Sequence, residues 1–185
     1  MNWFDTTSRM LRWLEWIAIA GGAVCSVAIM TIVGADVFAR YALNRPIAWS
    51  YDLISLFLLT GVFYLSLADT QRSGEHMAVD IVHNLASSRQ RHAMYAISYA
   101  LALPVVWLMM MGNIRSARRA FLNNEVLMGA VAWPTWVASF IVAVGLALLL
   151  LRLAHSFAGH ALSVAVRADL IPLPQKTGSQ EGSGL

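Results

Sequence analysis

Four long apolar segments limit what this chain can fold into. They cover about residues 16–35, 47–68, 93–114 and 133–151, and they are nearly free of charged side chains. The hydrocarbon core of a bilayer is about 30 Å thick, which about 20 helical residues can cross. The sequence therefore predicts an all-α membrane protein with four transmembrane helices.

The composition supports the membrane class. Hydrophobic residues make up 58% of the chain and charged residues only 12%, with a mean hydropathy of +0.61, whereas soluble domains carry about 25% charged residues. The net charge of +3 is too small and too scattered for a nucleic-acid partner. The single cysteine, Cys25, excludes an intrachain disulfide. We expect one transmembrane domain over residues 1–168 and a flexible polar tail over 169–185.

The first 14 residues mix aromatic and aliphatic side chains with Asp5, Arg9 and Arg12. This mixture is typical of an amphipathic helix that lies in the membrane interface among the lipids. A signal peptide is the alternative, because a basic stretch precedes an apolar core. The apolar run 16–35 is longer than a signal core, however, and no clear cleavage site follows it. We therefore expect a retained transmembrane helix.

The first connection, residues 36–52, holds the densest cluster of helix-ending and charged residues. Asp36 and Arg40 are four residues apart and share a helix face. Asn44 is a favourable N-cap and Pro46 is tolerated in a first helical turn, so this stretch predicts a helix end followed by a new start. The aromatic residues of the connection suit a membrane–water boundary: Tyr41, Trp49 and Tyr51. An interfacial loop between two transmembrane helices accounts for nearly all of this pattern.

The second connection, residues 69–92, contains the candidate residues Gly74, His76 and Asp80. His76, Asp80 and His83 have helical spacing, opposite an apolar face, which predicts a second interfacial amphipathic helix. Two imidazoles and a carboxylate on one face can ligate zinc. No fourth ligand is evident, and a polar face in water needs no metal, so we expect neither a metal nor a cofactor.

Two further patterns concern helix packing. Pro134 and Trp136 open the fourth span, which predicts a proline in its first turn beside aromatic residues of the interface. Small residues recur at every fourth position in three spans and can let helix backbones approach closely, although they are common in any membrane helix: Ala18, Gly22, Ser26, Ala96, Ala100, Ser139, Ala143 and Ala147.

Ionisable residues lie at the span edges or outside the spans. Charged groups at membrane depth usually mark ion paths or ligand sites, and haem needs histidines in the spans, so neither class is favoured. No set of residues is arranged for catalysis, and we expect no enzyme. Alone, the chain lacks the groups to move a charged solute, which indicates a helper subunit.

The first connection resembles the signature of the small, Q-type membrane subunit of tripartite ATP-independent periplasmic (TRAP) transporters. The matching positions there are Arg40, Tyr41, Asn44, Pro46 and Trp49, and a second patch matches at Gly74, His76 and Asp80. Asp52 stands where the family pattern has a glutamate. The resemblance covers about residues 1–165.

The resemblance implies a bacterial inner-membrane subunit that braces a large multi-span subunit. That large subunit would carry out sodium-coupled uptake of an organic acid delivered by a periplasmic substrate-binding protein, in contact with membrane lipids. Eight of the 13 Lys and Arg residues lie in the termini and second connection, which favours both termini in the cytoplasm. A stand-alone four-helix anchor or assembly subunit of a redox complex is the alternative.

Overall fold

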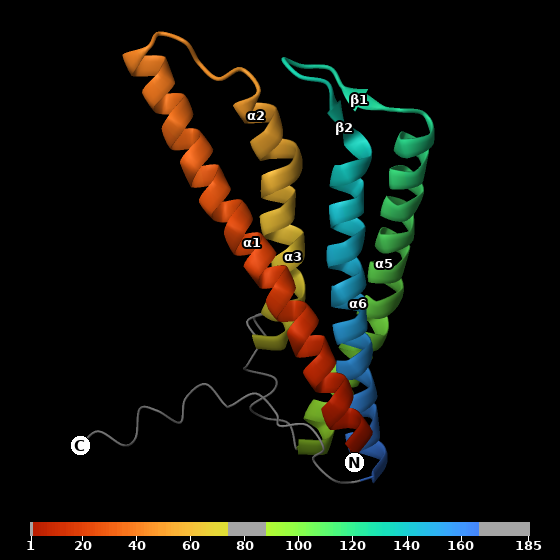
Figure 1. The fold of residues 1–185 in the computed structure, drawn as a ribbon. Coiled ribbons are helices and arrows are strands. Elements are labelled where there is room, and N and C mark those ends of the chain that lie inside the picture. Colours follow the sequence, from red (N-terminus) through yellow and green to blue (C-terminus); the bar gives the residue numbers. More distant parts are fainter. Residues whose placement is uncertain (1, 74–87, 167–185) are drawn as a thin grey trace, which may run out of the picture.

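The computed structural model describes residues 2–73 and 88–166 of the 185-residue chain, with side chains for 8–71 and 94–159 (Figure 1). Within these residues, four helices are long and apolar enough to cross a membrane: Ser8–Ala42, Ser50–Gln71, Met94–Leu122 and Thr135–Gly159. The predicted all-α fold with four transmembrane helices is confirmed. The helical elements are α1 (Asn2–Ala42), α2 (Ser50–Leu53), the π-helical turn η1 (Ile54–Leu58), α3 (Leu59–Ser73), α5 (Ser88–Leu122) and α6 (Thr135–Val166).

The helix α1 is longer than a membrane span needs. Its 41 residues correspond to about 60 Å, twice the thickness of the hydrocarbon core. Neither glycine nor proline interrupts residues 2–20, so the segment expected to form a separate interfacial helix continues directly into the first span. An interfacial N-terminal helix is therefore not confirmed. The one predicted between spans two and three, and the tail 169–185, lie outside the described residues.

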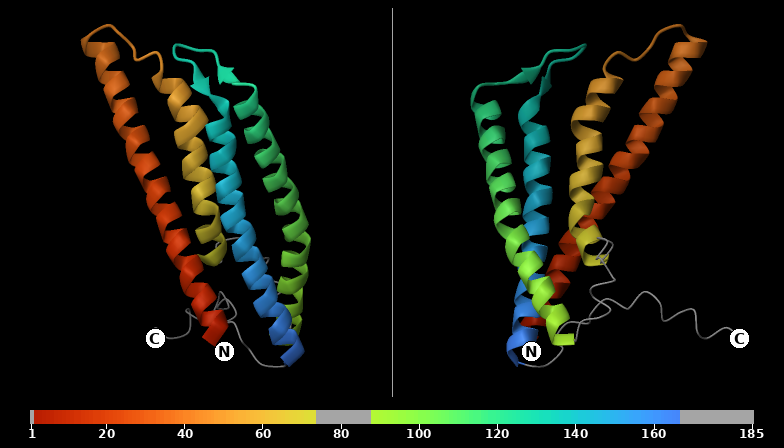
Figure 2. Two further views of the ribbon diagram at one scale, coloured as in Figure 1. Left: turned by 45° about the vertical axis from the view of Figure 1, so that its right-hand side comes forward. Right: turned by 180° about the vertical axis from the view of Figure 1, so that it is seen from behind.

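Rods that follow one another in the chain run in opposite directions (Figure 1). Asn2 and Val166 lie at one end of the bundle, which we call the terminal end. The connection from α1 to α2 and a two-stranded hairpin lie at the opposite end, which we call the loop end (Figure 2). In the bundle α5 packs on α6, α6 packs on α3, and α3 packs on α1, so α1 and α5 form the two outer helices.

Small residues bring the inner helices close together. Ala68 of α3 and Ala143 and Leu146 of α6 are buried. A Cβ atom on Gly145 of α6 would overlap the backbone carbonyl oxygen of Tyr64 in α3. Ala18 and Gly22 are buried too, and Gly22 faces the backbone of Val62 in α3. These small residues are therefore used for packing within the chain, as helices in a bilayer require.

The outer half of α1, from residue 24 to residue 41, separates from the other helices toward the loop end (Figures 1 and 2). Its large side chains are 44–82% exposed in the isolated chain: Val24, Val27, Met30, Val33, Val37, Phe38 and Tyr41. The inner half is held instead, with Leu11, Glu15 and Ala18 buried along one face. One helix thus has a packed half and a half without an intrachain neighbour on most of its surface.

Candidate functional site

The loop end brings together the two connections with the most helix-ending and charged residues. We call the first connection (residues 36–52) and the hairpin segment (residues 123–136) together the loop-end site. The hairpin consists of β1 (Val126–Leu127) and β2 (Trp133–Pro134), which pair antiparallel. Nine of the twelve candidate residues named from the sequence lie in the loop-end site, and the other three belong to the second connection.

Asn44 ends α1 and does not cap the next helix. Its φ of 51° is in the left-handed region, which asparagine tolerates better than most residues. The carbonyl of Ala39 accepts hydrogen bonds from the amides of Leu43 at 3.1 Å and Arg45 at 3.2 Å. The helix α2 starts only at Ser50, after a Trp49 that makes no side-chain cap. The N-cap expected at Asn44 is therefore wrong.

The carboxylate of Asp36 accepts a hydrogen bond from the segment that leads into α2. Its Oδ1 accepts a hydrogen bond from the backbone amide of Ile47 at 2.7 Å, and its Oδ2 accepts one from Arg40 Nη2 at 2.7 Å. The Asp36 side chain is 12% exposed, whereas that of Arg40 is 59% exposed. Ser50 Oγ donates to the carbonyl of Ile47 at 2.8 Å. One carboxylate thus fixes the segment after Pro46 to the end of α1.

Asp52 joins the first connection to the hairpin. Its carboxylate lies against Gly129, at the tip of the hairpin, where a Cβ atom would overlap it. A glycine at position 129 therefore allows this close approach, because it has no side chain. The contact links the start of the second span to the connection between the third and fourth spans.

The hairpin begins with a helix-ending motif. Asn124 has a φ of 50°, its amide donates to the carbonyl of Phe121 at 3.3 Å, and the Glu125 amide donates to the carbonyl of Ala120 at 2.9 Å. This is the Schellman arrangement, in which a left-handed residue follows the helix. The Glu125 carbonyl then accepts from Thr135 through both the amide at 3.2 Å and Oγ1 at 3.1 Å. These bonds close the hairpin at its base.

Pro134 lies in β2, and α6 starts one residue later at Thr135. The proline expected in the first turn of the fourth span is thus displaced just outside the helix. A two-stranded ribbon has only edge strands, where proline is tolerated because its missing amide proton leaves no ladder bond unmade. Trp136 is in the first turn and packs edge-to-face on Phe121 of α5, with ring centroids 5.5 Å apart.

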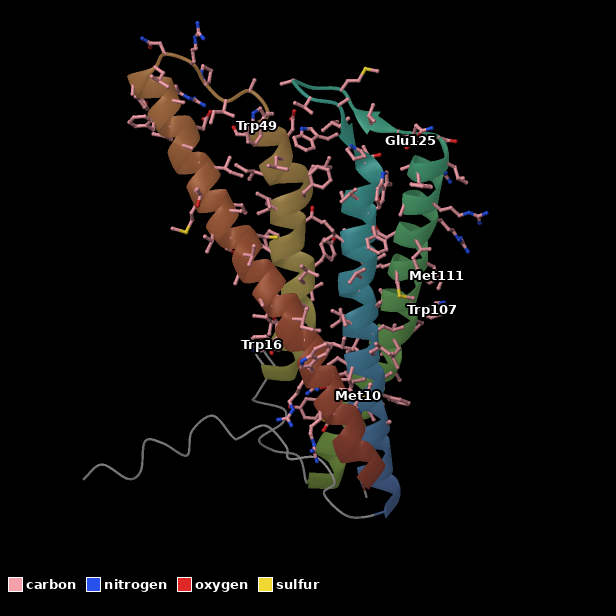
Figure 3. All side chains as sticks on the ribbon, in the orientation of Figure 1. Met10, Trp16, Trp49, Trp107, Met111 and Glu125 are labelled. Atoms are coloured by element: carbon pink, nitrogen blue, oxygen red, sulfur yellow. The ribbon has the colours of Figure 1, made fainter. Side chains whose placement is uncertain are left out.

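The aromatic residues of the site lie at the loop end, as expected for a membrane boundary. Figure 3 shows Trp49 beside the start of α2. Tyr41 and Tyr51 are 82% and 77% exposed. Trp133 packs edge-to-face on Phe57 of η1, with ring centroids 5.6 Å apart, so the hairpin also contacts the π-helical turn of the second rod. The contacts of Asp52 with Gly129 and of Phe57 with Trp133 therefore hold the second rod and the hairpin together.

Gly74, His76 and Asp80 lie outside the described residues, as does His83. The zinc-ligand spacing discussed for them consequently stays an interpretation of the sequence. Among the described residues, no group of three His, Cys, Asp or Glu side chains could hold a metal ion.

Sequence reasoning missed a polar contact at the terminal end. Glu15 of α1 is 1% exposed, and its Oε1 lies 3.6 Å from Nη1 of Arg152 in α6, which is 17% exposed. The sequence could have indicated this pair, because four spans place the start of the first span and the end of the fourth span on the same side of the membrane.

Comparisons with known proteins add the family. A family model described as "Tripartite ATP-independent periplasmic transporters, DctQ component" matches residues 29–162, which is more than half of the chain. A comparison with curated proteins finds no match. A comparison with solved structures finds none either. The matched region includes the whole loop-end site.

Proposed function

This chain belongs to the DctQ component family of tripartite ATP-independent periplasmic transporters, and on that premise we propose that it braces a large transport subunit during sodium-coupled uptake of an organic acid. A periplasmic binding protein would deliver the substrate to the pair. The family is that of a transporter component and not of an enzyme, and the four apolar helices suit a multi-pass protein of the inner membrane.

The observation that carries the proposal is the exposed outer half of α1. Six of its exposed residues recur with helical spacing and form one stripe: Val24, Val27, Thr31, Gly34, Phe38 and Tyr41. A Cβ atom on Gly34 would meet nothing within 4 Å. A small residue inside an apolar stripe lets a helix of another chain approach closely at membrane depth. We call these six residues the α1 stripe and assign them to the large subunit.

The loop-end site suits this role because it holds the outer half of α1 in place. Asp36 ties α1 to the start of the second rod, which in turn contacts the hairpin through Asp52 and Gly129. A brace must keep its shape while its partner moves. The hydrogen bonds and contacts of the loop end support that requirement.

The positions of the charged residues support placing the substrate and sodium sites in the large subunit. An organic acid needs compensating groups along its path, because an isolated charge at the bilayer centre costs several kcal/mol. The described ionisable side chains of this chain lie toward the two ends of its spans. We assign the substrate and sodium sites to the large subunit. The same placement and the family assignment favour this account over a redox anchor, which would need histidines within the spans.

For the orientation we propose cytoplasmic termini and a periplasmic loop end. Cysteine would be placed at Ser73 or at Asn44 in a chain whose Cys25 is replaced by Ser, and intact cells would be treated with an impermeant thiol reagent. Asn44→Cys should be labelled and Ser73→Cys should be protected until the cells are opened. The reverse pattern would overturn the orientation.

Co-purification with the large subunit tests the bracing contact. Gly34→Leu places a bulky group in the α1 stripe and should lower the amount of large subunit recovered with the tagged chain. Gly112→Leu is the matched control, since Gly112 of α5 also has open space around a Cβ position. Equal recovery with both variants would remove the α1 stripe from the contact. Failure of the unmodified chain to retain any large multi-span protein would contradict the proposed function itself.

A further inference from the structure

The loop end of α5 carries a cationic cluster that the proposed bracing role does not use. Arg115, Arg118 and Arg119 are exposed, and their spacing places them on neighbouring positions of the helix surface. Among the described side chains, none of the three takes part in an ion pair. The nearest acidic residue in sequence, Glu125, accepts a hydrogen bond from Asn123 instead.

An exposed apolar stripe leads to this cluster along α5. Leu101, Val105 and Leu108 are 68%, 56% and 69% exposed. Continuing with the same helical spacing, the stripe passes Gly112, where a Cβ atom would meet nothing within 4 Å, and ends at Arg115 and Arg119. A single face of α5 therefore changes from apolar to cationic just past the end of the predicted span 93–114.

The distances along the helix fit one leaflet of a bilayer. Val105 and Arg115 are ten residues apart, which corresponds to about 15 Å and to about half of the hydrocarbon thickness. An acyl chain lying along the stripe would thus place its headgroup at the arginines. Guanidinium groups match phosphate oxygens with paired hydrogen bonds and keep their charge at any physiological pH.

We propose that this face of α5 is a binding site for an anionic phospholipid, with Arg115 and Arg119 holding the phosphate and the stripe from Leu101 to Gly112 holding an acyl chain. Arg118 lies beside them and adds positive charge. The ligand is a lipid and not free phosphate, because the cationic cluster is continuous with an apolar surface at membrane depth.

A lipid is favoured over an acidic segment of a partner protein by the position of α5. The helices α1 and α5 are the two outer helices of the bundle, so a large subunit on the α1 stripe leaves α5 toward the bilayer (Figure 1). This choice of occupant depends on the proposed function. The experiment below uses the full chain without its partner, so its outcome is independent of whether bracing is correct.

Native mass spectrometry of the purified full chain, from micelles containing equal amounts of phosphatidylglycerol and phosphatidylcholine, tests the site. The unmodified chain should retain more phosphatidylglycerol than phosphatidylcholine. Arg115→Gln/Arg119→Gln should lower that retention by about tenfold, because each arginine near an anionic headgroup adds to the affinity. The matched control Arg9→Gln/Arg12→Gln removes the same charge from exposed positions at the terminal end and should stay within about twofold of the unmodified chain.

Two further arms keep the result interpretable. Arg115→Lys/Arg119→Lys preserves the charge and the fold and should retain an intermediate amount of lipid. Excess inorganic phosphate should not displace the lipid, because the acyl chain contributes to binding. Equal losses of lipid in the two glutamine variants, displacement of the lipid by phosphate, or unchanged lipid retention in Arg115→Gln/Arg119→Gln would each overturn the proposal.

Discussion

The carboxylate of Glu15 in α1 lies 3.6 Å from the guanidinium nitrogen Nη1 of Arg152 in α6, with Glu15 almost fully buried. Taking charges out of water is costly unless they are paired and hydrogen-bonded. The pair therefore restricts how α1 and α6 can slide along each other. At the other end of the same helix Asp36 binds the amide of Ile47, so a carboxylate fixes each end of α1.

Glu15→Gln should lower the free energy of unfolding by about 3 kcal/mol, because it breaks the buried ion pair with Arg152. Thermal or denaturant unfolding of the purified chain in detergent measures this. The control is Glu125→Gln, the same change at an exposed carboxylate, which should alter stability by less than about 0.5 kcal/mol. Exchange of the two charges, Glu15→Arg with Arg152→Glu, should recover part of the loss. Equal stability of the Glu15 and Glu125 variants would exclude a structural role for the pair.

Substitutions at Asp36 and Arg40 should differ in their effect on assembly. Asp36→Ala removes the acceptor for both Arg40 and the Ile47 amide and should lower recovery of the large subunit most. Arg40→Ala removes only the hydrogen bond to Asp36, from a largely exposed side chain, and should lower the recovery of the large subunit least. Asp36→Asn keeps an acceptor and should lie between them. Co-purification of each variant with the large subunit measures the order.

Exchanging the charges of Asp36 and Arg40 separates the role of the ion pair from that of the hydrogen bond to Ile47. Asp36→Arg with Arg40→Asp preserves an ion pair, yet an arginine at position 36 cannot accept the hydrogen bond from Ile47. Only partial recovery is therefore expected. Complete recovery would show that the ion pair matters and the bond to Ile47 does not.

Gly145→Ala should separate α3 from α6. The added Cβ would overlap the carbonyl oxygen of Tyr64, a backbone atom that cannot move without the helix, and overpacking of this kind costs about 1–3 kcal/mol. Gly112→Ala is the control, because its Cβ enters open space and alanine favours a helix by up to about 1 kcal/mol over glycine. Detergent-phase thermal unfolding should show a lower midpoint for the first variant and an unchanged or higher one for the second. Matching midpoints would contradict the close contact at Tyr64.

The fold was largely predictable from the sequence because the bilayer imposes segment lengths that composition reveals. Four apolar runs gave four helices, and the charges at their edges marked the connections. Helix boundaries were less predictable. The helix α1 continues through Asp5, Arg9 and Arg12 because nothing there breaks a helix, and the fourth helix starts after Pro134 because a short hairpin precedes it.

The loop-end site was only partly predictable, since long-range contacts have no local pattern. The spacing of Asp36 and Arg40 indicates that they share a helix face, but nothing in the sequence indicates that the amide of Ile47 lies within reach of Asp36. Likewise the contact of Asp52 with Gly129 joins residues that are far apart in the chain. Glu15 and Arg152 carried a usable signal, because both lie at the terminal end of their spans.

The central claim is that this chain transports nothing by itself and that transport fails without it. Uptake into liposomes measures this most directly, with the chain alone, the large subunit alone, or both subunits reconstituted. The binding protein loaded with an organic acid and a sodium gradient would be supplied outside in every case. We expect uptake only where both subunits are present. Uptake by this chain alone, or full uptake by the large subunit alone, would contradict the account.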